Sequence, residues 1–191
     1  MRVLVAEDET LIRLDLCGML EKAGHEICAQ AKDGAEAVEL ARSALPDLAV
    51  LDVKMPHLDG IEAARRILDE RPVPIVIVSA YTEQALVQRA AESGVFGYLA
   101  KPFREDGLLP AIATARARFE ELVAVREEVE SLAEALAARK AIERAKGILM
   151  EKEGLTEAEA FARLRSASQV SGRPMRVLAE AVIATFPNAL A

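Results

Sequence analysis

The sequence predicts an α/β protein: a doubly wound sheet of five parallel strands, then a long helix and a small all-helical domain. Over residues 1–103, five short apolar runs alternate with stretches of helical period. Beyond Phe103 the strand signal ends, and a segment without Gly or Pro runs from Ala111 to Lys146. Parallel strands need crossover helices and become almost continuously apolar when both faces are covered, as these runs are.

The strands and helices of the first domain alternate strictly. The predicted strands are Val3–Ala6, Ile27–Ala31, Leu48–Leu51, Val73–Val78 and Val95–Leu99. The predicted helices between them are Leu11–Lys22, Ala35–Ala44, Ile61–Glu70 and Glu83–Ser93. Asp33 and Glu36 have the spacing of a capping box at the start of the second helix.

The long helix is expected to begin at Ala111, because Gly107 and Pro110 interrupt the pattern before it. Five apolar residues within it follow the 3-4-3-4 spacing of a coiled-coil seam: Leu122, Val125, Val129, Leu132 and Leu136. This spacing is typical of a helix that pairs with another helix, so we expect a homodimer. The alternative is a helix that lies on the surface of its own protein.

Three helices are predicted at the C-terminal end. The first covers residues 138–153 and ends at Gly154, and Thr156 with Glu159 forms a capping box for the second. Ser171-Gly172 ends the second helix, Pro174 suits the first turn of the third, and Pro187 ends it. We therefore expect a first domain at 1–118, a helical linker at 119–137 and a three-helix domain at 138–191.

Composition restricts the possible functions. The longest near-apolar run, residues 73–81, is far shorter than the roughly 20 residues of a membrane span, so we expect a cytoplasmic protein without membrane partners. Cys17 and Cys28, the only cysteines, lack metal-ligand spacing.

A net charge of −7 for the whole chain argues against a protein that binds nucleic acid. However, residues 1–136 hold 15 basic and 25 acidic side chains, whereas residues 137–191 hold 9 basic and 6 acidic ones. The charge argument against nucleic acid therefore does not apply to the C-terminal part of the chain.

Polar side chains close four of the predicted strands: Glu7 and Asp8, Asp52, Ser79 and Lys101. Because parallel strands present their C-terminal ends to one sheet edge, these groups should meet there. Oxygen-only ligands favour Mg²⁺ as the ion that offsets the crowded acids. An acid cluster beside an ammonium and a hydroxyl suits a phosphoryl group, with a carboxylate as the nucleophile. Taken singly, each acid could be an ordinary solvated loop residue.

These motifs resemble the receiver domain of two-component response regulators over about residues 1–118. They are Glu7-Asp8, the run from Leu51 to Gly60 around Asp52, Ser79-Ala80, and Tyr98 to Pro102. The resemblance implies a flavodoxin-like sheet of strand order 2-1-3-4-5.

The resemblance also implies a role for each site residue. Asp52 would be the phosphoacceptor of a partner histidine kinase, and Glu7, Asp8, Asp52 and the backbone carbonyl of Lys54 would arrange Mg²⁺. The other implied roles are phosphoryl contact for Lys101, a cis bond before Pro102, and switch positions for Ser79 and Tyr98. Such chemistry is regulatory, so we do not expect an enzyme.

The last domain carries a basic face on its first helix. A helical projection puts Arg139, Lys140, Arg144 and Lys146 within an arc of about 160°, opposite the apolar side chains. From its charge alone, this face could equally be an ordinary solvated surface or a surface that binds phosphate groups.

The runs from Ala141 to Met150 and from Leu155 to Arg165 resemble the ANTAR domain, an RNA-binding module of transcription antiterminators. The resemblance implies binding to paired RNA stem-loops that prevents a terminator hairpin from forming. The candidate RNA contacts are Arg139, Lys140, Arg144, Lys146 and Arg165.

We therefore predict a phosphorylation-dependent antiterminator. Two alternatives remain open. One is a DNA-binding regulator with a helix-turn-helix output, and the other is a protein-interaction regulator that acts through the helical linker without nucleic acid.

Overall fold

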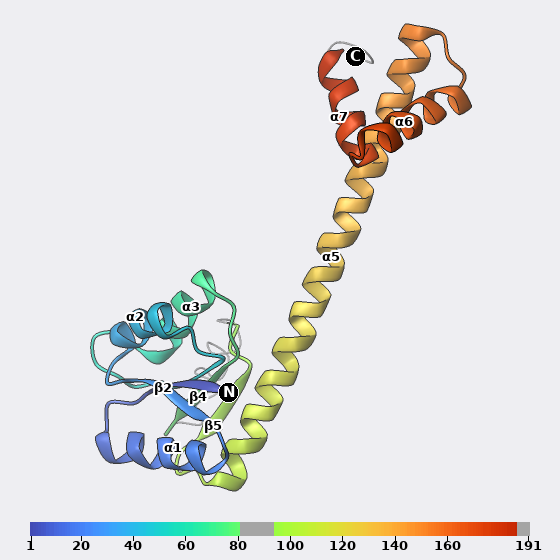
Figure 1. The fold of residues 1–191 in the computed structure, drawn as a ribbon. Coiled ribbons are helices and arrows are strands. Elements are labelled where there is room, and N and C mark those ends of the chain that lie inside the picture. Colours follow the sequence, from blue (N-terminus) through green and yellow to red (C-terminus); the bar gives the residue numbers. More distant parts are fainter. Residues whose placement is uncertain (81–93, 187–191) are drawn as a thin grey trace. The chain divides into compact units, whose positions relative to one another are not determined.

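The computed structural model describes residues 1–80 and 94–186, and it contains the predicted parallel sheet (Figure 1). The strands are β1 (Arg2–Ala6), β2 (Glu26–Ala31), β3 (Leu48–Asp52), β4 (Ile75–Ser79) and β5 (Gly97–Ala100). All neighbouring strands pair in parallel, in the order β2-β1-β3-β4-β5. The fold class and the strand order expected from the sequence are confirmed.

Helices cover both faces of the sheet. The helices α2 (Gly34–Ala44) and α3 (Gly60–Glu70) pack on one face, and α1 (Thr10–Lys22) and the start of α5 (Glu105–Glu153) pack on the other. Strand β1 shows the division, because Leu4 and Ala6 face α2 and α3 while Val3 and Val5 face α1 and α5. Burial of apolar side chains on both faces accounts for the nearly continuous apolar runs.

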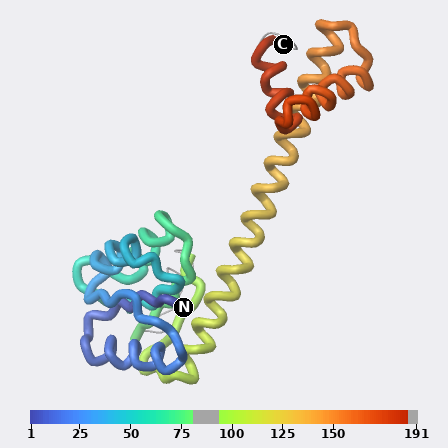
Figure 2. The backbone as a smooth tube through the Cα atoms, in the orientation of Figure 1, coloured from blue at the N-terminus to red at the C-terminus, as the bar shows by residue number. Residues whose placement is uncertain are grey.

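The chain divides into two compact units, residues 1–123 and 124–191. The second unit contains the end of α5 together with α6 (Glu157–Ser171) and α7 (Met175–Thr185), as the tube in Figure 2 shows. Its core is small and consists mainly of alanine and leucine: Ala145, Leu149, Ala160, Leu164 and Ala179. The domain boundaries expected at 118 and 137 stay a prediction, because both lie within the single helix α5.

Two local expectations were wrong. Helix α5 begins at Glu105 rather than Ala111 and contains Pro110 in its second turn. Pro110 lacks the N–H of one helical hydrogen bond, but Leu108, two residues before it, is fully buried against the sheet and holds this turn in place. At α2, Asp33 caps Glu36 N as expected, but the Glu36 carboxylate accepts from Lys32 N rather than from Asp33 N.

The capping box at α6 is complete, since Thr156 and Glu159 satisfy each other's backbone N–H groups. Gly172, at φ 67°, ends that helix in the left-handed conformation, as the sequence indicates. The expected helix Glu83–Ser93 and the helix end at Pro187 lie outside the described residues. Within the described ranges, no helix is both long enough and apolar enough to cross a membrane.

Candidate functional site

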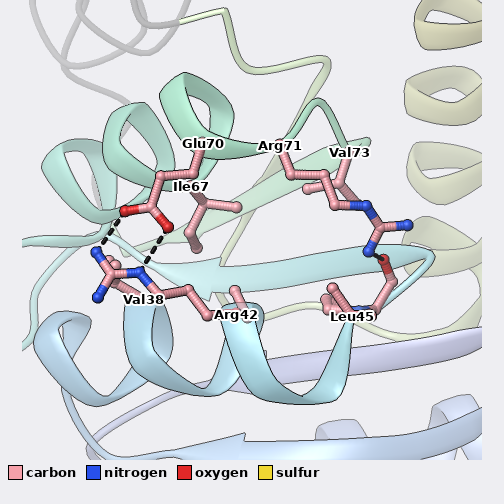
Figure 3. A pocket seen from close by; sticks show the side chains of 9 residues that line it. Val38, Arg42, Leu45, Ile67, Glu70, Arg71 and Val73 are labelled. Atoms are coloured by element: carbon pink, nitrogen blue, oxygen red, sulfur yellow. Dashed lines mark hydrogen bonds and ion pairs between the residues drawn. The ribbon is translucent and has the colours of Figure 1, made fainter.

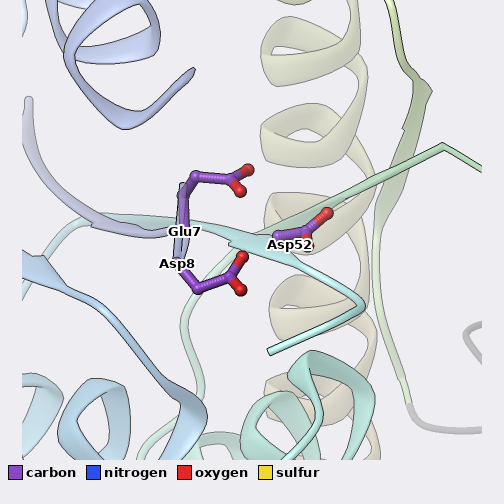
Figure 4. Close-up of side chains that lie close together, drawn as sticks. All are labelled: Glu7, Asp8 and Asp52. Atoms are coloured by element: carbon purple, nitrogen blue, oxygen red, sulfur yellow. The ribbon is translucent and has the colours of Figure 1, made fainter. Parts of the chain in front are cut away.

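Three carboxylates meet at the C-terminal edge of the sheet. Glu7 and Asp8 follow β1, and Asp52 is the last residue of β3 (Figure 4). One carboxylate oxygen from each lies within 4.8 Å of the others. Glu7 is 1% exposed and Asp52 is 5% exposed, whereas Asp8 is open to solvent. The oxygen-only donor set fits a hard divalent cation such as Mg²⁺.

The ammonium group of Lys101, just after β5, balances part of this negative charge. Its Nζ lies 2.6 Å from Glu7 Oε2 and 2.9 Å from Asp52 Oδ1. Burial raises the pKa of Glu7 and of Asp52, although their contacts with Lys101 act in the opposite direction. Burial would lower the pKa of Lys101, but its hydrogen bonds to both acids outweigh this effect and raise the pKa.

The other predicted receiver residues lie on β4, on β5 and in the loops that follow β3 and β5. Ser79 ends β4 and is buried, and Tyr98 of β5 packs beside the core formed with α2 and α3. The backbone N–H of Lys54 donates to Asp52 Oδ2 over 3.1 Å. The Lys101–Pro102 peptide bond is cis. The sheet edge therefore brings together Glu7, Asp8, Asp52 and Lys101, with the backbone of Ser79 hydrogen-bonded to that of Lys101, whereas Tyr98 lies within β5 against the core.

Two glycines that the sequence analysis missed hold the loop after Asp52. Gly60 and Gly34 begin α3 and α2, each preceded by an Asp N-cap. A Cβ on Gly34 would lie 2.3 Å from the carbonyl oxygen of Leu58, and one on Gly60 would meet the Asp52 carbonyl. The repeated pattern Asp-Gly-x-Glu at 33–36 and 59–62 was the available signal, because a cap Asp followed by Gly marks a helix start in close backbone contact.

A cavity of about 340 Å³ lies elsewhere in this unit, between the C-terminal ends of α2 and α3 (Figure 3). Its walls are mostly apolar, and the Arg42 guanidinium forms two hydrogen bonds with the Glu70 carboxylate at its rim. Arg71 donates to the carbonyl oxygen of Pro46. The charged side chains of this cavity, Arg42, Glu70 and Arg71, already bond to other protein groups. The cavity therefore offers a ligand no cluster of acids beside an ammonium such as the one at Asp52.

The predicted RNA contacts differ in their environment. Arg139, Lys140 and Arg144 on α5 and Arg165 on α6 are exposed, and none forms an ion pair within the described part of the chain. Lys146 is only 7% exposed. Its Nζ lies 2.9 Å from Glu143 Oε2 and 2.7 Å from Glu157 Oε1.

Lys146 thus joins α5 to the first residue of α6. The two hydrogen-bonded carboxylates raise its pKa and keep the ammonium charged. Because both acids already take its donors, this geometry favours a structural role for Lys146 over contact with a phosphate.

Comparison with known proteins identifies two domain types. The model of the response regulator receiver domain matches residues 3–113, and the model of the ANTAR domain matches residues 130–183. The first match contains every residue of the acid cluster, and the second contains the four exposed candidates for RNA contact, Arg139, Lys140, Arg144 and Arg165.

The transcriptional regulatory protein PdtaR of Mycobacterium tuberculosis is similar along nearly the whole chain. It is 48% identical over 185 residues, which are 97% of this chain and 90% of PdtaR. The chemotaxis protein CheY of Thermotoga maritima is 34% identical over 112 residues, 58% of this chain and 93% of CheY.

Solved structures match the first unit. A response regulator receiver domain protein from Clostridium thermocellum has a TM-score of 0.57 at 28% identity, covering 63% of this chain and 98% of that one. The complex of CheX and CheY with BeF3 and Mg²⁺ from Borrelia burgdorferi also gives 0.57, at 25% identity, over 59% of this chain and 86% of the matched chain.

Proposed function

Because this chain belongs to the response regulators that join a receiver domain to a C-terminal ANTAR domain, we propose that a histidine kinase phosphorylates Asp52 and that the phosphorylated protein binds RNA. The observation that carries this proposal is the position of Asp52. One of its oxygens lies within 4.8 Å of oxygens from Glu7 and Asp8, and its Oδ1 lies 2.9 Å from Lys101 Nζ, which also contacts Glu7.

Asp52 is the carboxylate best placed as the nucleophile. One of its oxygens would attack the phosphorus of a phosphohistidine, the N–P bond would break, and the imidazole would leave and take up a proton. The product is an acyl phosphate on Asp52. Lys101, already paired with Asp52 at 2.9 Å, would supply positive charge to the phosphoryl oxygens.

Magnesium is the cofactor that the donor set suits. Asp8 and Asp52 would be its direct carboxylate ligands, with Glu7 and the backbone carbonyl of Lys54 completing the site. When bound, the ion offsets the charge of the acids and of the incoming phosphoryl group. The similar CheY complex carries Mg²⁺, which supports this choice.

The kinase would approach along α1. Leu11 is 82% exposed and Leu14 is also open to solvent, although both are large apolar side chains. Leu11 lines a cavity of about 520 Å³ together with Lys101 and Phe103, so an apolar partner docked there would lie next to the acid cluster. The phosphohistidine of the docked kinase would thus lie close to Asp52.

Phosphorylation would act through Ser79 and Tyr98. A phosphoryl group adds about −1.5 to −2 charges and new hydrogen-bond acceptors. The buried Ser79 hydroxyl would turn toward it, and Tyr98 would move into the space released, which alters the surface of β5. A local change in charge would in this way bias a two-state surface.

The seam along α5 supports a homodimer of the phosphorylated form. Its five side chains are between 38% and 63% exposed, although all are valine or leucine. Pairing with a second copy of α5 would bury them, as in a coiled coil. The sedimentation coefficient of the protein should therefore rise on phosphorylation and stay low in Val129→Glu.

RNA binding is the output that the second unit supports. Arg139, Lys140, Arg144 and Arg165 are exposed and form no ion pair among the described residues. Residues 137–191 have three more basic than acidic side chains, whereas residues 124–136 of the same unit have three more acidic than basic ones. Hairpin loops are where proteins usually read RNA sequence. Phosphorylated dimers would hold two adjacent stem-loops and so prevent a terminator hairpin, which is antitermination.

Labelling with a phosphodonor tests the first step. Wild type and Asp69→Asn, which alters an exposed carboxylate on α3, should incorporate phosphate equally, while Asp52→Asn should incorporate none. Equal, stable labelling of Asp52→Asn would reject Asp52 as the acceptor.

A further inference from the structure

Among the large apolar side chains of the second unit that are exposed in the described part of the chain, Phe161 is the one aromatic ring. Phe161 on α6 is 41% exposed, although its neighbour Ala160 and Leu164, one turn on, are buried. The only other aromatic residue after residue 123 is Phe186. Exposure of a phenyl ring is unfavourable in water, so a binding partner that covers it would gain stability.

The charge around Phe161 indicates what kind of partner this is. Arg165 lies one turn further along α6, on the same side as Phe161. The residues three and four positions from Arg165 are Phe161, Ala162, Ser168 and Gln169, and none of them is acidic. Glu157, one turn before Phe161, is already paired with Lys146.

Arg165 also differs from the other cations of α6 and α7. Arg163 pairs with Glu153, and Arg176 pairs with Glu180. Arg165 forms no ion pair with any residue that the structure describes. Helical spacing therefore puts an exposed aromatic ring and a guanidinium without an ion pair among the described residues one turn apart on the same side of α6.

We propose that Phe161 and Arg165 form a stacking site for one unpaired base of an RNA hairpin loop. The ring would lie against the face of the base, and the guanidinium would contact the adjoining phosphate or the base plane. Stacking on aromatic and guanidinium planes is how proteins capture splayed bases. This inference rests on the proposed RNA binding and adds the contact that recognises the loop.

A protein partner is the rival occupant of this surface. An apolar contact alone would not need an uncompensated cation beside the ring, whereas a nucleotide offers both a π face and a negative charge. The charge of the site therefore favours RNA.

The test uses the phosphorylated full-length protein and a pool of RNAs, each with two adjacent hairpins of fixed stems and randomised loops. Phe161→Leu keeps the apolar bulk but removes the π face, and Phe161→Tyr keeps both. We expect Phe161→Leu to bind the pool about 5- to 100-fold more weakly and Phe161→Tyr to bind like wild type. The thermal unfolding of both variants should match wild type.

Further measurements separate the outcomes. The dependence of affinity on salt should be unchanged in Phe161→Leu, because stacking releases no counterions, and should weaken in Arg165→Gln. Equal binding by wild type and Phe161→Leu would overturn the stacking site while RNA binding stands. Loss of self-association in Phe161→Leu would also overturn it, in favour of a protein contact. No binding by wild type would instead reject the proposed function and this inference with it.

Discussion

A Cβ atom on Gly60 would lie 1.9 Å from the carbonyl oxygen of Asp52, well inside the closest approach of real atoms. Gly60 N also donates to the Val53 carbonyl over 3.0 Å, so the start of α3 is fixed against the loop that follows Asp52. Any side chain at this position must displace that loop. The position of the phosphoacceptor candidate thus depends on a missing side chain eight residues away.

Gly60→Ala should therefore lower the free energy of unfolding by about 2 kcal/mol and slow labelling of Asp52 by a phosphodonor. The matched control is Gly18→Ala, because Gly18 lies within α1 and a Cβ there meets nothing within 4 Å. The control should be more stable than wild type by about 0.5–1 kcal/mol and should label normally. Denaturant unfolding and labelling rates check both, and a Gly60→Ala protein that behaves like Gly18→Ala would refute the argument.

Magnesium should stabilise the protein through the acid cluster. At a concentration ten times its Kd, a ligand specific for the folded state adds about 1.4 kcal/mol to the free energy of unfolding. Asp52→Asn removes one of the two direct carboxylate ligands, so the effect of Mg²⁺ on its unfolding temperature should be much smaller. Calorimetry with Mg²⁺ and with a chelator measures both proteins. An equal shift in the two would place the ion elsewhere.

Lys146 and Arg144 should behave differently although they lie two residues apart. Lys146→Met breaks the contacts with Glu143 and Glu157, so the unfolding temperature should fall while the slope of log affinity for RNA against log salt stays unchanged. Arg144→Gln should leave stability unchanged and reduce that slope by about 1. Thermal unfolding and salt titrations of RNA binding give the two readings. If Lys146→Met instead reduced the salt slope and left the unfolding temperature unchanged, Lys146 would be an RNA contact.

The pKa of Glu62 should lie well below the ordinary value of a glutamate. Its hydrogen bonds to Arg65 and Arg66 lower the pKa from the ordinary 4.5 to about 2. A depressed pKa means that Glu62 contributes stability above pH 4.5, which is lost as the pH falls toward 2. Carboxyl NMR titration measures this pKa directly, and Glu62→Gln should show a flatter decline of stability over that window. A measured pKa near 4.5 would show that these ion pairs do not persist in solution.

The sheet could be predicted from the sequence because buried parallel strands are runs of apolar residues. Parallel strands all end at the same edge, so the residues that follow them could be predicted to meet there. The start of α5 was predicted wrongly, because burial of Leu108 stabilises a helical turn before Pro110 that the sequence pattern does not reveal. A helical projection placed Lys146 on an open basic face because it treats one helix alone. Its partner Glu157 belongs to the next helix, and only tertiary structure brings the two together.

We expect phosphorylation of Asp52 to control RNA binding. The most direct measurement compares phosphorylated and unphosphorylated full-length protein against RNAs with two adjacent hairpins and against duplex DNA. Phosphorylation should strengthen hairpin binding, Asp52→Asn should not respond to the phosphodonor, and duplex DNA should bind weakly to both forms of the protein. Tight binding to duplex DNA without hairpin binding, or no binding to either nucleic acid, would contradict this expectation.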